Sequence, residues 1–350
     1  MKKLLILLLI SSIAILSAIP LHIVYDLDTI FTQNVWHLSE YDLERVDEGS
    51  EYVAFAESAD DLILKSKVKF STDYAFSKRF KIVPSAKLAY NYYLSNGEKS
   101  SSSILCGVDI DYKPFALELR YGFYPGSYLR DYKDNKSILY DGTGDYEKFE
   151  YDKNLYKAGL NWQAFKKHRF SGSIKMEDYY HNEYFTEYDG RAFTYELGWR
   201  GSFPGVYLDF SYAFKKFETE DDIASLYAPD ADYDEIPSDW SYESNIYNAR
   251  VRLKKIDTSN KNFKYRLVLD LDLENRFYQG SDSIHAGRED LTMELSPAIV
   301  FYFNKNFDIT LDYSYLNRTV ESPDSSVPKY KNYTDNAVSL GLSYKFDLFD

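Results

Sequence analysis

Cysteine is almost missing from this sequence. The single Cys106 excludes disulfide bonds within the chain and any metal site built from several cysteines. Histidine is scarce too, with 5 residues in 350, so we predict no metal site and no cofactor. Basic residues are the minority charge: 41 Lys and Arg face 55 Asp and Glu, which gives a net charge of -14. Because phosphate binding requires clustered lysine and arginine, nucleic acid is excluded as a partner.

Long apolar runs are confined to the N-terminus. Lys2 and Lys3 precede an apolar stretch over residues 4–16, and the small side chain of Ala18 offers a cleavage site. This pattern predicts a secretory signal peptide over residues 1–18, with an uncleaved anchor as the alternative. No later run reaches the roughly 20 residues of a membrane-spanning helix, and the mean hydropathy is -0.46. The sequence therefore excludes a helical membrane protein.

Aromatic residues and alternating patterns are abundant. Tyrosine supplies 35 residues, phenylalanine 23 and tryptophan 4, and these types favour strands and membrane–water interfaces. From about residue 60 onward, thirteen runs alternate between apolar and polar side chains. In one run Leu267, Leu269 and Leu271 form the apolar face, and Arg266 and Asp270 lie on the other. The runs exceed the roughly 5–6 residues of an ordinary strand and are long enough for the roughly 9–11 that cross a bilayer.

The links between the runs alternate between short and long. Residues 304–306 form a short link, whereas residues 218–243 form a long one. Short turns at one end and long loops at the other are typical of antiparallel membrane barrels, whose apolar face meets lipid. A soluble β-sandwich, with its apolar face inward, is the alternative. Aromatic residues gather near both predicted rims, among them Tyr90, Tyr121, Tyr278 and Tyr313 at the loop end and Trp162, Phe170 and Phe303 at the turn end.

The fold class that follows is all-β, an antiparallel transmembrane β-barrel over residues 49–350. A barrel with both ends on the periplasmic side needs an even number of strands, so we assign a fourteenth strand to residues 51–56. Residues 19–48 show no clean alternation. They are predicted to form a periplasmic extension or a plug, with two further strands as the alternative.

The last run carries a motif. Residues 339–346 begin with a polar side chain, have Gly341 third, and have Tyr344 and Phe346 sixth and eighth. In this the chain resembles the outer-membrane β-barrel proteins of Gram-negative-type bacteria, which usually end in such a signal for the barrel-assembly machinery. It departs from them because residues 347–350 follow the final aromatic. The resemblance implies an outer-membrane location, with lipid and the assembly machinery as partners, and makes these three residues the assembly signal.

Charged residues populate the polar faces of the predicted strands, which line the lumen of such a barrel. Rings of charge orient solutes in pores, so these residues are a candidate constriction. A salt-bridged or closed interior is an equal alternative. The candidates are Lys65, Lys67, Lys69, Arg250, Arg252, Lys254, Lys264, Arg266, Asp270, Asp272 and Glu274.

The link over residues 218–243 has many carboxylates and no lysine or arginine. Asp230, Asp232 and Asp234 alternate like the start of a calcium loop, but the glycine and the last glutamate of that motif are missing, which excludes it. Together with Glu235 they would form an acidic extracellular mouth and give a pore a mild cation preference. A solvated acidic loop is the alternative.

Two loop histidines, His181 and His285, raise the alternative of an enzyme at the rim. Asp178, Glu183 and Ser281 lie near them in sequence, but a nucleophile, a base and an orienting group must meet in space. We therefore predict no enzymatic activity. The sequence favours a passive porin-like channel for small solutes, and a structural or surface-binding barrel with a closed lumen is the main alternative.

Overall fold

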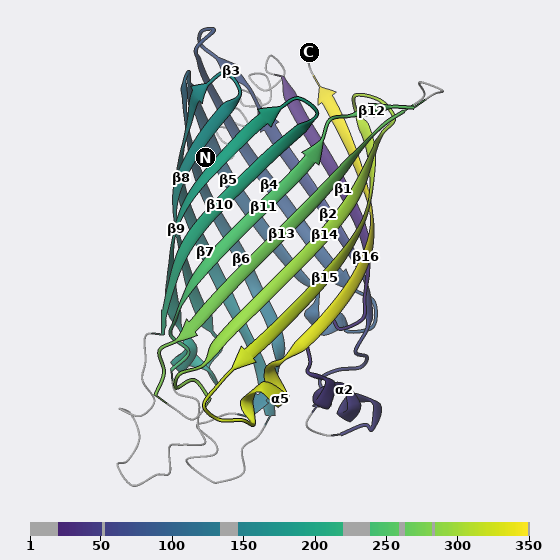
Figure 1. The fold of residues 1–350 in the computed structure, drawn as a ribbon, viewed down its shortest axis with the longest axis vertical. Coiled ribbons are helices and arrows are strands. Elements are labelled where there is room, and N and C mark those ends of the chain that lie inside the picture. Colours follow the sequence, from purple (N-terminus) through teal and green to yellow (C-terminus); the bar gives the residue numbers. More distant parts are fainter. Residues whose placement is uncertain are drawn as a thin grey trace, which may run out of the picture.

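The computed structural model describes residues 20–50, 53–133, 146–219, 239–258, 263–281 and 284–348. They form one closed barrel of fourteen long antiparallel strands (Figure 1). The long strands are β1 (Leu21–Thr32), β2 (Asp61–Thr72), β4 (Phe80–Tyr93), β5 (Ser101–Tyr112), β6 (Phe115–Lys133), β7 (Tyr146–Phe165), β8 (His168–His181), β9 (Gly190–Phe203), β10 (Val206–Thr219), β11 (Tyr242–Leu253), β13 (Lys264–Tyr278), β14 (Glu289–Tyr302), β15 (Phe307–Glu321) and β16 (Tyr333–Leu348). Two short strands, β3 (Tyr74–Ala75) and β12 (Ile256–Asp257), extend links between long strands.

Short helices lie at one end of the barrel, the end with the long loops (Figure 1). They are the α-helices α2 (Glu40–Asp47) and α5 (Val327–Lys331) and the 3-10 turns η2 (Gly97–Lys99) and η3 (Thr186–Tyr188). Ser39 is the N-cap of α2: its side-chain oxygen accepts a hydrogen bond from the backbone N–H of Asp42 at 3.1 Å. Within the described ranges, no helix is long and apolar enough to span a membrane.

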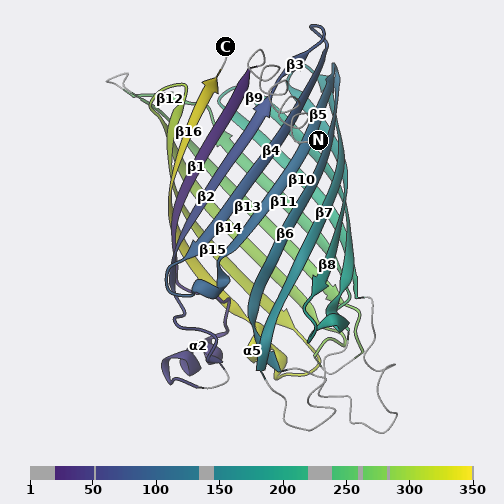
Figure 2. The same ribbon diagram turned by 180° about the vertical axis from the view of Figure 1, so that it is seen from behind.

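The ring closes where the first strand meets the last. β1 pairs with β2 on one side and with β16 on the other, and Leu21 lies opposite Leu348 (Figure 2). The long strands have between 12 and 20 residues, as a tilted bilayer crossing requires. We call this β1–β16 pairing the seam.

The links differ in length between the two ends, as the sequence predicts. Strands β5 and β6 are joined by residues 113–114, β7 and β8 by residues 166–167, and β9 and β10 by residues 204–205. We call this the turn end; longer links such as residues 33–60 lie at the opposite, loop end. In membrane barrels short turns are periplasmic and long loops are extracellular, which orients the molecule.

The position predicted for the first strand is wrong. Residues 53–56 form a turn, and Phe55 packs against Trp36 with ring centroids 4.9 Å apart. The first strand is β1, so residues 21–32 belong to the barrel wall and not to an extension or plug. The apolar side chains of Val24 and Ile30 fall on the inner face of β1 and hide its alternation. The predicted signal peptide lies outside the described residues.

Candidate functional site in the barrel lumen

The polar faces of the strands point into the barrel. A cavity of about 700 Å³ is lined together by Lys65 of β2, Arg130 of β6 and Arg276 of β13, which lie on different sides of the ring, so it is inside the wall. The apolar faces point outward, and Leu267 and Leu269 expose 39% and 42% of their surface. The alternation of β13 therefore runs as predicted, with charge inside and leucine outside.

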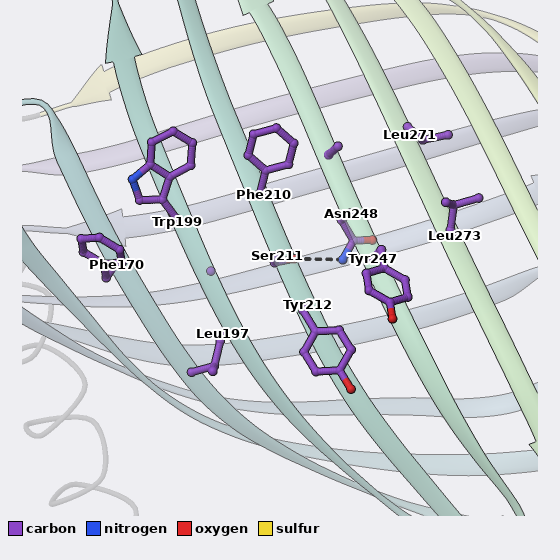
Figure 3. Close-up of a pocket in the computed structure, with 12 residues that line it drawn as sticks. Phe170, Leu197, Trp199, Phe210, Ser211, Tyr212, Tyr247, Asn248, Leu271 and Leu273 are labelled. Atoms are coloured by element: carbon purple, nitrogen blue, oxygen red, sulfur yellow. Dashed lines mark hydrogen bonds between the residues drawn. The ribbon is translucent and has the colours of Figure 1, made fainter.

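The outer face is apolar and shallowly grooved. Figure 3 shows one groove across β8 to β13, lined by Phe170, Trp199 and Phe210 among others. The dashed line in Figure 3 is the hydrogen bond from Asn248 Nδ2 to Ser211 Oγ, 3.0 Å long, and both residues also line a cavity on the inner side. Lipid chains are the natural occupants of an apolar groove on the outside of a membrane barrel.

The inner cavity on the turn-end side measures about 450 Å³, and we call it the turn-end cavity. Arg250 lies opposite Asp270 in the ladder and donates to it, with Nη2 3.0 Å from Oδ2. Arg252 donates to Asp209 at 2.6 Å, and Arg200 pairs with the same carboxylate. Of the arginines that the sequence singled out, Arg250 and Arg252 thus bind carboxylates on adjacent strands.

The other predicted lumen residues divide into paired and unpaired groups. The pairs are Lys67 with Asp28 at 2.8 Å, Lys264 with Asp257 at 2.9 Å, and Glu274 with Arg276 at 3.2 Å. Within the part of the chain that the structure describes, no ion pair is formed by Lys65, Lys69, Lys254, Arg266 or Asp272. Arg266 instead lies 5.7 Å from the ring centroids of both Tyr207 and Tyr302. Whether these residues form a constriction stays a prediction.

The 700 Å³ cavity at the loop end, which we call the loop-end chamber, has a surplus of positive charge. The basic side chains that line it are Lys65, Lys99, Arg130, Arg276, Arg288, Arg318 and Lys331, and the carboxylates are Glu294, Asp312 and Asp335. Sequence reasoning found only Lys65 of the basic set. The others come from separate strands, turns and a helix, so no local run of charge could have revealed them.

Only part of this positive charge is neutralised nearby. Arg288 and Arg318 share the buried carboxylate of Asp290, with Arg288 Nε 2.8 Å from Oδ1. Lys99, Arg130 and Lys331 form no ion pair with any residue that the structure describes. The chamber is therefore an electropositive space beneath the extracellular loops.

Burial affects the protonation of the chamber's loop residues. Burial, together with the charge of Arg130, lowers the pKa of Lys331 to about 7 and that of Lys99 to about 8. Burial also lowers the pKa of His37 to about 4, so this imidazole is neutral at pH 7. His37 has a left-handed backbone with φ 53°, and its ring stacks on Tyr333 with centroids 4.8 Å apart. Such strain is often stored at functional sites.

Aromatic rings cover the loop end of the chamber. Lys99 Nζ lies 4.1 Å from the ring centroid of Trp36. Trp240 lies 6.4 Å from Tyr132 on β6 and 6.3 Å from His285, which follows β13. Trp240 thus contacts residues from loop-end elements that are far apart in the order of the ring.

The two histidines considered for a rim enzyme belong to this aromatic packing. The His181 ring lies 4.8 Å from Phe149, and its Nδ1 lies 3.2 Å from Asp189 Oδ1. The His285 ring lies 5.0 Å from Tyr278. Asp178 pairs with Arg191 at 2.5 Å rather than with a histidine. Among the residues placed by the structure, no cluster of three or more His, Cys, Asp and Glu could hold a metal.

The predicted assembly signal lies on the seam. Gly341 is opposite Asp28 of β1, and a Cβ at this position would lie 2.7 Å from Asp28 Oδ1. Glycine therefore leaves room for the carboxylate that binds Lys67. Tyr344 and Phe346 face outward, with ring centroids 4.4 Å apart. Their role in assembly stays a prediction, and Asp230, Asp232, Asp234 and Glu235 of the acidic loop lie outside the described residues.

A closed ring of strands can cross a bilayer because no strand edge is left unpaired. The side chains of Tyr90, Tyr121, Tyr313, Trp162, Phe170 and Phe303, which were predicted for the two girdles, are exposed on the outer face. Trp162, Phe170 and Phe303 lie near the turn end, as predicted, whereas Tyr121 and Tyr313 lie nearer the turn end than the loop end of their strands. Tyr278, which was predicted for the loop-end girdle, lines the chamber instead. The chain is a transmembrane β-barrel of the kind that spans the outer membrane of Gram-negative bacteria.

Solved outer-membrane proteins are among the structures to which the chain is similar, at low sequence identity. The outer membrane channel DcaP of Acinetobacter baumannii is 11% identical with a TM-score of 0.47, over 93% of this chain and 96% of that one. The anion-selective porin from Comamonas acidovorans is 8% identical with a TM-score of 0.44, over 93% and 98%. A loop-deletion mutant of OmpT, an outer membrane protein of Vibrio cholerae, is 8% identical with a TM-score of 0.47, over 94% and 100%. No family model and no curated protein matches the sequence.

Proposed function

We propose that the barrel is a passive porin-like channel for small solutes, with a charged lumen and an acidic extracellular mouth. A barrel of this strand count has a backbone diameter of roughly 25–30 Å, which leaves space for a lumen. The turn-end cavity and the loop-end chamber share Glu294 in their linings, so they adjoin along the barrel. The acidic mouth rests on the sequence of residues 218–243 alone.

The observation that carries the proposal is the direction of the ion pairs. Arg250 with Asp270 joins β11 to β13, Arg252 with Asp209 joins β11 to β10, and Lys67 with Asp28 joins β2 to β1. Each pair connects adjacent strands. These three pairs run along the wall and not across the lumen, which supports a polar passage over a salt-bridged plug.

Conductance in a planar lipid bilayer tests the proposal. The purified barrel is judged folded if its mobility on a gel changes only after heating. The folded protein should give stepwise increases in current, with a linear current–voltage relation. The same protein boiled before addition is the control. A folded barrel that inserts into the bilayer without carrying current would favour the alternative of a structural or surface-binding barrel with a closed lumen.

A further inference from the structure

We infer that the loop-end chamber is a binding site for a small organic anion built on a ring, such as an acidic sugar or an aromatic carboxylate. The inference rests on the proposed function, since a solute selected here would be one that the channel admits. It adds a ligand class to a pore that is otherwise described only as passive.

The charges are the first part of the argument. Lys99 of η2, Arg130 of β6 and Lys331 of α5 approach the same space from three separate elements. Arg130 is near enough to both lysines for its charge to lower their pKa. Collecting like charges in a partly dry space costs free energy unless a counter-charge is bound. An anion in the chamber would supply that counter-charge through several charge-assisted hydrogen bonds.

The aromatic walls are the second part. The chamber is lined by the rings of Trp36, Tyr93, Tyr132, Trp240, Tyr242, Tyr278, Tyr330 and Tyr333. Arginines already lie over two of these rings, Arg276 at 4.2 Å from Tyr242 and Arg288 at 4.4 Å from Tyr278. Flat apolar faces beside fixed cations suit a ligand with a ring body and an acidic group.

The size of the chamber is the third part. About 700 Å³ falls within the roughly 300–1,000 Å³ of small-molecule sites. A simple inorganic ion would fill little of this volume and would leave the aromatic walls unused. A neutral sugar would contact the rings but would leave the cations uncompensated. The combination of volume, rings and cations therefore favours the organic anion.

Tryptophan fluorescence gives a direct binding test. Trp162 and Trp199 lie on the outer face, so changing both to phenylalanine leaves Trp36 and Trp240, which line the chamber, as reporters. We expect glucuronate or benzoate to change this fluorescence in a saturable way, and glucose and inorganic phosphate to have much weaker effects. If glucuronate binds more tightly than benzoate, the chamber prefers a sugar ring; if benzoate binds more tightly, it prefers an aromatic ring.

Charge removal then locates the site. The double variant Arg130→Gln with Lys331→Gln should bind the better organic anion about tenfold more weakly or worse, because each lost hydrogen bond to a charged group contributes appreciably. Lys216→Gln is the matched control, since Lys216 pairs with Glu218 at the rim, away from the chamber lining. All variants are compared after the heat shift confirms that the barrel is folded.

The outcomes separate the two proposals. Saturable binding without conductance would overturn the channel and leave the binding site standing. Conductance with no binding, or with equal binding in the double variant, would overturn the site and leave the channel standing. Phosphate that binds as tightly as glucuronate and benzoate would overturn the organic-anion assignment.

Discussion

The turn-end cavity and the loop-end chamber lie inside one ring of strands, but their charges are balanced differently. In the turn-end cavity, Arg250 and Arg200 bind carboxylates on adjacent strands. In the loop-end chamber, Lys99, Arg130 and Lys331 meet without a carboxylate partner in the described part of the chain. One half therefore has charges that stabilise its wall, and the other has charges left over for a ligand.

The difference in charge pairing follows from how the structure determines which residues lie next to each other. In the wall, register places each charged residue opposite a particular residue of the next strand, and opposite charges are stabilising there. At the mouth, turns and short helices bring together residues that no ladder aligns. Selection for binding can act on such positions without weakening the barrel, so we expect wall mutations to affect stability and mouth mutations to affect ligand preference.

Breaking the seam should have the largest effect, because both halves depend on a closed ring. In Gly341→Leu the new side chain would collide with Asp28 and separate β1 from β16. We expect most of the heat-modifiable barrel to be lost from membranes, with smaller losses for Tyr344→Ala and Phe346→Ala. Gly97→Leu is the control, because a Cβ there has no atom within 4 Å. Normal barrel levels in all three seam variants would disprove the role of this strand in closure.

A charge on the outer face should have the next largest effect. Leu269→Arg would place a guanidinium against lipid and cost about 2–4 kcal/mol near the membrane midplane. Ser296→Arg is the matched change on the inner face, where Asp270 lies opposite and can pair with the new cation. Urea unfolding in lipid vesicles measures both. Equal destabilisation by the two changes would mean that the assigned inner and outer faces of β13 and β14 are wrong.

Removing one wall carboxylate sharpens the comparison between the halves. Asp270→Asn leaves Arg250 without its partner and removes one of the carboxylates that line the turn-end cavity, which makes the cavity less negative. We expect the reversal potential in a KCl gradient to shift toward anion preference. Asp324→Asn removes the same charge from an exposed loop position and serves as the control. An unchanged reversal potential in Asp270→Asn would show that permeating ions do not sense the turn-end cavity.

The chamber should also respond to pH, whereas the arginine-based wall should not. With a pKa of about 7, Lys331 is charged below pH 7 and neutral above it, and Lys99 follows near pH 8. Anion binding should therefore weaken several-fold from about pH 6 to about pH 8.5, because positive charge is lost as pH rises. The charged groups that act on Lys331 are Arg130, Arg288, Arg318 and Asp42.

A permanently charged side chain provides the control for this pH effect. Lys331→Arg keeps its charge across the range, so its binding should depend less on pH than that of the natural chain. His37 stays neutral throughout because its pKa is about 4. Binding of the natural protein that strengthens as pH rises would contradict the assignment of these lysines to the ligand.

The smallest expected effect is that of the acidic loop. Changing Asp230, Asp232, Asp234 and Glu235 to their amides should shift the reversal potential slightly toward anions at low salt. The shift should fade at high salt, since the Debye length falls from about 10 Å at 0.1 M to about 3 Å at 1 M. A shift that persists unchanged at 1 M salt would mean that these carboxylates act at close range and not through the field at the mouth.

The alternating runs predicted the barrel wall well, because period-2 alternation is imposed directly by the two environments of each strand. β1 was not predicted because Val24 and Ile30 interrupt the polar pattern of its inner face. Ile30 packs against the cluster of Val35, Trp36 and Ile63, so its apolar side chain contacts the loop-end core and not lipid. Ile30 is apolar because of a tertiary contact, and the alternation of a strand sequence does not reveal such a contact.

The candidate site was harder to predict than the fold. Arg250 and Arg252 stand out because they are close in sequence, yet register gives them carboxylate partners on β10 and β13. Lys99, Arg130 and Lys331 are far apart in sequence, and only the closure of the ring and the folding of the mouth bring them together. A charge cluster made by such contacts leaves no local signal.

The seam has a consequence for protein engineering. Because Leu21 lies opposite Leu348 at the turn end, a peptide fused ahead of β1 or behind β16 would project into the periplasm and stay hidden from antibodies outside the cell. Surface display on this scaffold therefore requires insertion into a loop-end link, and the link over residues 94–100, between β4 and β5, offers Gly97 with open space around it.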